Sequence, residues 1–269
     1  MNIPSEFFEV GENELGEQFI KNGFFIQPVE NQESLDQIHE LVAATAGKFL
    51  GIDLAKSEEF LNNIHKEVGA ARLNDLRLSV ISRLNTDIAL RPSYFSLARK
   101  LLAALVGNEL AMQLRLNLSI QLPGDDSSLL PVHADVWSGD SPYEVVAWLP
   151  LVDCYRTKSM FLLPPEHAQS LHERFSDYRE KSSENLYQDI KANLKWVEIK
   201  YGEILVFNQN LPHGNRVNEE DETRWSLNCR FKSVFSPYGD KKLGEFFEPV
   251  TLRPASRLGM HYRYPKTKD

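Results

Sequence analysis

The sequence predicts an α+β protein whose core is a double-stranded β-helix, a cupin-like jelly-roll, preceded by a layer of helices. Through most of residues 1–108 the apolar side chains recur at the 3.6-residue spacing of amphipathic helices. From Leu110 the spacing changes to two, which is typical of strands with one buried face. Short antiparallel strands covered on one side by helices fit a jelly-roll.

The helical layer is predicted from three apolar runs. Residues 34–51 carry apolar side chains on one helical face, and Gly51 marks the end of that helix. A second run from Leu61 to Leu84 continues through one or two further helices. A last helix begins near Pro92 and runs to Gly107.

The first predicted strand covers residues 110–122 and alternates cleanly. Its apolar face holds residues 114, 116, 118, 120 and 122, and its polar face holds residues 113, 115, 117, 119 and 121. Later strands are expected at 144–152, 158–163, 195–199, 203–208, 211–217 and 223–232, with one or two helices between Pro165 and Leu194. Without a linker or repeat, we expect one domain over residues 1–269: a helical layer (1–108), a jelly-roll core (109–235) and a tail (236–269).

Composition limits the classes of partner and the compartment. The chain has 269 residues, a formal net charge of −8 and no basic stripe for nucleic acid. No apolar run is long enough to cross a membrane, and the first residues lack the pattern of a signal peptide. Two cysteines do not make a disulfide framework, so a reducing, cytoplasmic location is expected. The oligomeric state stays open.

Two histidines and an aspartate have the spacing of a metal site. His133 and Asp135 form an H-x-D pair, and His213 follows much later in the chain. Two imidazoles and one carboxylate on one face of iron(II) leave three coordination positions open for a cosubstrate and dioxygen. We therefore expect these three residues to be both the metal ligands and the catalytic centre.

Arg224 and Ser226 add an anion site to this pattern. Residues 211–217 and 223–232 read as the two strands of a hairpin, which would place position 224 roughly opposite His213 and on the same face. A guanidinium holds a carboxylate through two parallel hydrogen bonds, and the Ser226 hydroxyl can add a third. Iron(II), Asp135, one arginine and a dicarboxylate would then sum to zero charge. Arg230 shares the parity of Arg224, so it is the alternative holder of that carboxylate.

These motifs resemble the 2-oxoglutarate-dependent, non-haem iron(II) oxygenases, specifically the phytanoyl-CoA dioxygenase-like branch. The resemblance extends to Phe19–Ile26, similar to the helix–Gly–strand opening of that branch, and to Trp148–Leu151, similar to its strand after the metal loop. The chain also resembles a subset found among bacterial surface-carbohydrate genes. The resemblance implies a hydroxylase that uses Fe(II), 2-oxoglutarate and dioxygen and releases succinate and carbon dioxide.

The polar face of the first predicted strand is interpreted as a cavity lining. Asn117, together with Trp148 on a later strand, is expected at the cosubstrate, and Gln121, Arg115 and Lys158 are expected at the substrate. A polar lining favours a small polar substrate such as a sugar or sugar derivative. The alternatives are that this strand face and Lys158 lie in solvent and that Trp148 is only part of the core.

Two other functions fit the same residues. A zinc hydrolase could use the two histidines and the aspartate, with Glu144 as its general base, but it would leave Arg224 without a role. A barrel that binds a carbohydrate without turnover is the third hypothesis.

Overall fold

The structure is a computed structural model that describes residues 5–52 and 57–266. Residues 1–4, on which the expected absence of a signal peptide partly rests, lie outside the described residues. The ends of the predicted single domain, at residues 1 and 269, lie outside them too.

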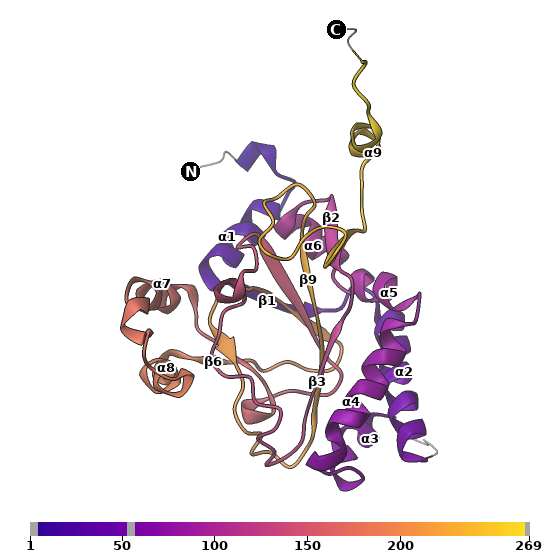
Figure 1. The fold of residues 1–269 in the computed structure, drawn as a ribbon, viewed down its shortest axis with the longest axis vertical. Helices are drawn as coiled ribbons and strands as arrows, with labels where there is room; N and C mark the ends of the chain where they lie inside the picture. The colour runs from indigo at the N-terminus through magenta and orange to yellow at the C-terminus, as the bar shows by residue number, and fades with distance from the viewer. Residues whose placement is uncertain (1–4, 53–56, 267–269) are drawn as a thin grey trace.

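Two antiparallel sheets form the centre of the fold (Figure 1). The larger sheet has the strand order β1-β7-β4-β9-β2-β10, and β3 pairs with β9 beside this path. Its strands are β1 (Phe24–Pro28), β2 (Leu110–Gln113), β3 (Asn117–Gln121), β4 (Glu144–Pro150), β7 (Glu203–Asn208), β9 (Arg224–Ser233) and β10 (Phe247–Pro249). The smaller sheet has the order β6-β5-β8 and contains β5 (Phe161–Leu162), β6 (Lys195–Trp196) and β8 (His213–Gly214). This architecture is the predicted jelly-roll with helices added.

Helices lie on both sides of the sheets. The N-terminal helices are α1 (Glu12–Asn22), α2 (Gln32–Leu50), α3 (Ser57–Asn63), α4 (Ala70–Asn85), α5 (Leu90–Ser96) and α6 (Arg99–Val106). The later ones are α7 (Pro165–Glu173), α8 (Ser183–Ile190) and α9 (Pro254–His261). Short 3-10 helices cover Ser5–Phe7, Ile64–Lys66, Asp135–Ser138, Arg156–Lys158, Phe175–Tyr178 and Lys191–Asn193. In Figure 1, α2 to α5 lie on one side of the sheets, α7 and α8 lie on the other, and α9 projects away from the body.

The limits of α2 follow from its sequence. The Asn31 side chain accepts a hydrogen bond from the Ser34 backbone N–H at 3.1 Å, which caps the start of the helix. Gly51 ends the helix with a φ of 72°, a left-handed conformation that glycine adopts at little cost. The predicted end at Gly51 is confirmed.

Strand β9 separates an apolar core from a polar interior. Trp225, Leu227, Cys229 and Phe231 face the helices, and all four are fully buried. The Trp225 indole N–H donates to the Leu61 carbonyl of α3 at 3.0 Å. Because side chains alternate along a strand, the residues between these four point to the opposite face, between the two sheets.

Several predicted strands are shorter in the structure, and one is divided. The predicted strand 110–122 is interrupted after Gln113, where the Asn85 side chain of α4 bonds both the N–H and the carbonyl of Leu116. These two bonds replace ladder partners, so the chain bends and β2 and β3 form separately. The predicted segments 158–163, 195–199 and 211–217 keep only two-residue strands.

The predicted hairpin between residues 211–217 and 223–232 is wrong. Strand β8 pairs with β5 in the smaller sheet, with His213 opposite Leu162. Strand β9 pairs instead with β3 and β4 in the larger sheet, and Arg224 lies opposite Gln121. The segment 218–222 therefore connects two different sheets.

The helical layer and the tail each contribute a strand to the larger sheet. Strand β1 pairs with β7 and β10 pairs with β2. No helix in the described part of the chain is long and apolar enough to cross a membrane. Cys154 and Cys229 are buried and free.

The Tyr94 hydroxyl fastens the helical layer to the larger sheet, which gives a stability prediction. It donates to the Ala147 carbonyl at 2.9 Å and lies 3.3 Å from the Leu227 carbonyl, in fully buried surroundings. We expect Tyr94→Phe to lower the free energy of unfolding by about 1–2 kcal/mol, because these carbonyls lose a buried donor. Urea denaturation measures this, with Tyr262→Phe at an exposed position as the control. Equal midpoints for the two variants would contradict the prediction.

Candidate active site

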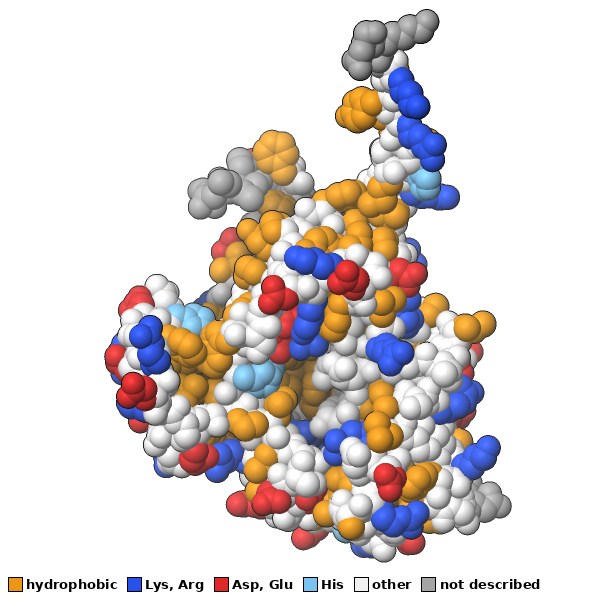
Figure 2. Space-filling view, in the orientation of Figure 1, with side chains coloured by type: hydrophobic (Ala, Val, Ile, Leu, Met, Phe, Trp, Pro, Cys, Tyr) orange, Lys and Arg blue, Asp and Glu red, His pale blue; other side chains and the backbone are white. Residues whose placement is uncertain are grey.

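A cavity of about 420 Å³ lies between the two sheets. Its lining includes residues of β3, β4, β7 and β9 from the larger sheet and of β8 from the smaller one. Figure 2 shows the hollow near the middle of the visible face, with a histidine at its edge. The polar face of β9 forms one wall, through Arg224, Asn228 and Arg230.

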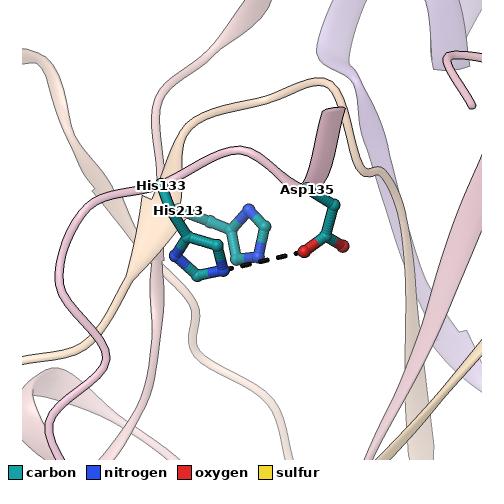
Figure 3. A group of neighbouring side chains, drawn as sticks. All are labelled: His133, Asp135 and His213. Carbon is teal, nitrogen blue, oxygen red and sulfur yellow. Dashed lines mark ion pairs between the residues drawn. The ribbon is translucent and has the colours of Figure 1, made fainter. Parts of the chain in front are cut away.

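His133, Asp135 and His213 come together at this cavity. One possible ligand atom from each lies within 4.8 Å of the others, a separation that a single metal ion can bridge. Their side chains point toward one another (Figure 3), and His133 Nε2 lies 3.7 Å from Asp135 Oδ1. The structure thus brings together the three residues that were selected from the sequence.

Backbone pairing sets the two imidazoles side by side. His133 and His213 form an antiparallel bridge, with reciprocal N–H to carbonyl bonds of 3.0 and 2.8 Å. Residues directly opposite in such a pair point to the same face. Gly214 allows the chain after His213 to lie close to the backbone of Leu130, because a Cβ at position 214 would stand 2.7 Å from the Leu130 carbonyl oxygen.

Backbone carbonyls also select the tautomer of each imidazole. His133 Nδ1 donates to the Pro131 carbonyl and His213 Nδ1 donates to the Leu211 carbonyl, each at 2.9 Å. A carbonyl only accepts, so Nδ1 carries the proton and Nε2 keeps its lone pair. Burial lowers the pKa of His213 to about 4, so this ring is neutral over the physiological range. An imidazole whose Nε2 keeps its lone pair suits a divalent metal.

Arg230 orients the Asp135 carboxylate. Its Nη2 lies 2.8 Å and its Nε 3.2 Å from Asp135 Oδ2, which leaves Oδ1 directed toward the histidines. Burial by itself would raise the pKa of Asp135, but Arg230 and the two histidines lower it below its usual value. Asp135 is therefore an anion with one oxygen available to a cation.

Arg224 is a buried cation without an anionic partner among the described residues. The residue is 3% exposed, and its guanidinium donates to the Ser159 carbonyl and to the Ser119 hydroxyl, each at 2.9 Å. Burial lowers its pKa to about 10, which leaves it charged at neutral pH. Since burying an unpaired charge is costly, the site favours an anionic ligand.

Four buried polar atoms at or near the Arg224 guanidinium have no hydrogen-bond partner among the residues that the structure describes. They are Arg224 Nε, Ser226 Oγ, Gln121 Oε1 and Ser159 Oγ. Gln121 is the partner of Arg224 across the β3–β9 ladder, and Ser226 is two residues along the same strand. Buried polar groups are usually hydrogen-bonded, so a cluster of four without partners indicates a place for a polar ligand.

The remaining predicted site residues divide into two groups. Asn117 and Trp148 line the cavity, whereas Ser226 and Gln121 are fully buried behind its lining. Arg115 is exposed in the bend between β2 and β3, because the strand is interrupted there. Lys158 is fully buried outside the cavity, where its ammonium contacts Glu222 at 2.6 Å and Asn62 at 2.7 Å. The expected substrate contacts of Arg115 and Lys158 are therefore wrong. The Gln121 amide donates its N–H to the Arg216 carbonyl.

Sequence reasoning missed other lining residues, chiefly Asn228, Asn215 and Arg77. Asn228 could have been found from its parity with Arg224. Arg77 follows Leu73 by four residues, so it shares the buried face of α4, and a cation on that face was an available signal. The place of Asn215 at the cavity depends on the path of the chain just after β8.

Glu144, the base required by the zinc-hydrolase hypothesis, does not line the cavity. It is buried beside Gln209, which donates to it at 3.0 Å, and its carboxylate also accepts from the Ser141 N–H at 3.3 Å. Burial raises the pKa of Glu144, and Asp140 adds to the rise. This hypothesis therefore loses its proposed base.

The chain is similar to known non-haem oxygenases. The family described as phytanoyl-CoA dioxygenase matches residues 21–225. The non-heme monooxygenase ThoJ is similar in its nickel complex (17% identity, 90% of this chain and 85% of that chain, TM-score 0.51) and in its apo form (18%, 89% and 84%, TM-score 0.52). HygX from Streptomyces hygroscopicus, with nickel and 2-oxoglutarate bound, has a TM-score of 0.49 at 15% identity over 86% of this chain and 89% of that chain.

No curated protein matches the chain in sequence. These structural similarities are at low identity and concern the fold. The family match covers most of the chain, from the end of α1 into β9, and includes both histidines, Asp135 and Arg224. The chain therefore belongs to the phytanoyl-CoA dioxygenase family of 2-oxoglutarate-dependent, non-haem iron(II) oxygenases.

Proposed function

We propose that this oxygenase holds iron(II) with His133, Asp135 and His213, binds 2-oxoglutarate at Arg224, and hydroxylates a small polar substrate. The observation that carries the proposal is the buried, unpaired Arg224 on the wall of the same cavity as the three ligand residues. A carboxylate on Arg224 would neutralise a charge that the described residues leave unmatched.

The donor set suits iron(II). Two imidazole nitrogens and one carboxylate oxygen lie within 4.8 Å of one another, and all three residues line the open cavity. This leaves coordination positions for a cosubstrate and dioxygen, unlike a closed structural site with four protein ligands. The bound metal supplies the redox chemistry, in which 2-oxoglutarate and dioxygen become succinate and carbon dioxide while a substrate C–H becomes C–OH.

The surroundings of Arg224 suit the distal carboxylate of 2-oxoglutarate. The guanidinium donates to Ser159 and Ser119 through two of its five N–H groups, which fixes its plane and leaves donors free. The Ser226 hydroxyl, without a partner in the described part of the chain, lies on the same face of β9 as Arg224, which supports a contact with the same carboxylate. Arg230 is already paired with Asp135, so Arg224 is the better candidate of the two.

The rest of the lining favours a polar substrate of limited size. Neutral polar side chains from four parts of the chain line the cavity: Asn117, Ser127, Ser128, Asn215 and Asn228. The amide of Asn117 donates to Asn228 at 2.9 Å, so the two side chains form a fixed pair. Such groups recognise hydroxyls, as on a sugar or sugar derivative, and a cavity of about 420 Å³ is within the range of small-molecule sites.

Apolar side chains shield the reacting centre. Trp148, Phe207 and Met160 form the apolar wall of the cavity. They keep water from the metal side, which strengthens the contacts of Arg224 and Asp135 with their ligands. Trp148 thus acts as a wall of the site rather than as a hydrogen-bonding group.

The metal assignment predicts the effect of removing a ligand. We expect Asp135→Ala and His213→Ala to lose 2-oxoglutarate-dependent succinate formation and most of their bound iron, because only two protein ligands remain. Both should stay folded, since the core is apolar and independent of the metal. Iron content, succinate release and circular dichroism measure these effects.

His167→Ala is the matched control, because His167 lies on α7 away from the cavity. It should keep wild-type iron content and turnover. Normal iron content in both ligand variants would rule out the assignment, and turnover without 2-oxoglutarate would favour a hydrolase.

The cosubstrate assignment predicts a separate effect. Arg224→Ala should raise the KM for 2-oxoglutarate by about thirtyfold or more, since losing a partner of a buried charge pair costs about 2–5 kcal/mol. Arg224→Lys should restore only part of this affinity, because an ammonium cannot make the bidentate contact. Succinate formation as a function of 2-oxoglutarate concentration measures both.

Arg230→Ala separates the two arginines. It should weaken iron binding more than 2-oxoglutarate binding, because Arg230 orients Asp135. The exposed Arg83→Ala serves as the control for loss of an arginine. If Arg230→Ala raised the KM for 2-oxoglutarate and Arg224→Ala did not, the two roles would have to be exchanged.

A further inference from the structure

Arg77 brings a third arginine to the cavity, from a helix that sequence reasoning did not connect with the site. It lies on α4 and lines the same cavity as the three ligand residues. The Asn85 side chain of α4 hydrogen-bonds the backbone of Leu116 in the bend between β2 and β3. These bonds fix the position of α4 relative to the cavity wall. Arg77 is half-buried, with its guanidinium against the loop before the metal-binding segment.

The guanidinium is positioned but not neutralised. Its Nη2 donates to the Ser128 hydroxyl at 3.1 Å, and its Nε is buried without a hydrogen-bond partner among the described residues. Asp125 in the same loop accepts from the N–H and hydroxyl of Ser127 at 3.0 and 2.8 Å, and forms no ion pair with Arg77. A cation held by a neutral hydroxyl keeps its charge available to a ligand.

The charges of the cavity are not balanced by the metal and cosubstrate alone. Iron(II), Asp135, Arg224 and the two carboxylates of 2-oxoglutarate sum to zero. The cavity lining adds Arg230 and Arg77, and no further acidic side chain of the described residues lines it. Arg230 contacts Asp135 at 2.8 Å and lies 3.9 Å from the Asp140 carboxylate, whereas Arg77 contacts the Ser128 hydroxyl and pairs with no acidic side chain of the described residues. The charge of Arg77 is therefore left without a counterpart when the metal and the cosubstrate are bound.

We propose that Arg77, together with the Ser128 hydroxyl, binds an oxyanion group of the substrate, so that the substrate is an anionic polar molecule bearing a phosphate, sulfate or carboxylate. The proposal rests on the proposed function, because the charge count assumes that 2-oxoglutarate occupies Arg224. Arg77 then determines specificity, holding the charged end of the substrate while its remaining part reaches the metal.

Inorganic anions test the proposal without knowledge of the whole substrate. The full-length protein is loaded with Ni(II) and saturating 2-oxoglutarate, so that Arg224 is occupied. Phosphate, sulfate or acetate is then titrated at constant ionic strength by calorimetry, with glycerol as a neutral probe. The variants are Arg77→Ala, the longer polar Arg77→Gln and the control Arg83→Ala, which removes an exposed arginine from the same helix.

We expect the wild type and Arg83→Ala to bind an oxyanion with equal affinity, and both Arg77 variants to bind it about tenfold or more weakly, since hydrogen bonds to a charged group are lost. The KM for 2-oxoglutarate should be unchanged in all of them. Tighter binding of phosphate or sulfate indicates a phosphate or sulfate ester as substrate, and tighter binding of acetate indicates a carboxylate.

No oxyanion binding by the wild type, or equal binding after loss of Arg77, overturns the inference. A raised KM for 2-oxoglutarate in the Arg77 variants also overturns it, because Arg77 would then serve the cosubstrate. Succinate formation by the same variants loaded with Fe(II) instead of Ni(II) tests the proposed function separately. If it is normal while oxyanions do not bind, only the inference about Arg77 fails.

Discussion

The alternation of side chains along β9 is the constraint on which the rest of the structure depends. One face of the strand holds Trp225, Leu227, Cys229 and Phe231 in the core beneath the helices, and the other directs Arg224, Asn228 and Arg230 into the cavity. A shift in register by one residue would bury the arginines among apolar side chains and remove the apolar face from the core. Both changes would cost free energy of folding, so the register of β9 is fixed. The register in turn determines which side chains of β9 line the cavity.

The two sheets make different contributions to the chemistry. The smaller sheet and the adjoining bridge hold His133 and His213 through their backbones, with each imidazole oriented by a carbonyl two residues earlier. The larger sheet supplies the cations, Arg230 against Asp135 and Arg224 farther along the same strand. The proposed metal ligands and Arg224 therefore reach one cavity from separately paired strands.

The arginines are distinguished by what they contact. Arg230 pairs with Asp135, Arg224 is buried against neutral oxygens, and Arg77 is half-buried against one hydroxyl. From Arg230 to Arg224 to Arg77, the protein neutralises less of the charge of the guanidinium. The three arginines match three tasks in that order: orienting Asp135, binding a dicarboxylate, and binding the charged end of a substrate. The first is observed in the structure, and the other two are the proposals above.

The sequence by itself determined the features that depend on local periodicity and residue chemistry. The helical layer, the end of α2 at Gly51, strand β7 over residues 203–208, and the residues His133, Asp135, His213 and Arg224 all follow from spacing and side-chain type. Tertiary structure decided what depends on pairing between distant segments. Arg224 reaches the cavity from the sheet opposite His213 rather than through a hairpin, Asn85 of α4 bends the chain at Leu116 and leaves Arg115 in solvent, and Lys158 is buried against Glu222. The physical reason is that the alternation along a strand determines which of its residues share a face. Which other strand or helix packs against that face depends on the packing of the whole chain.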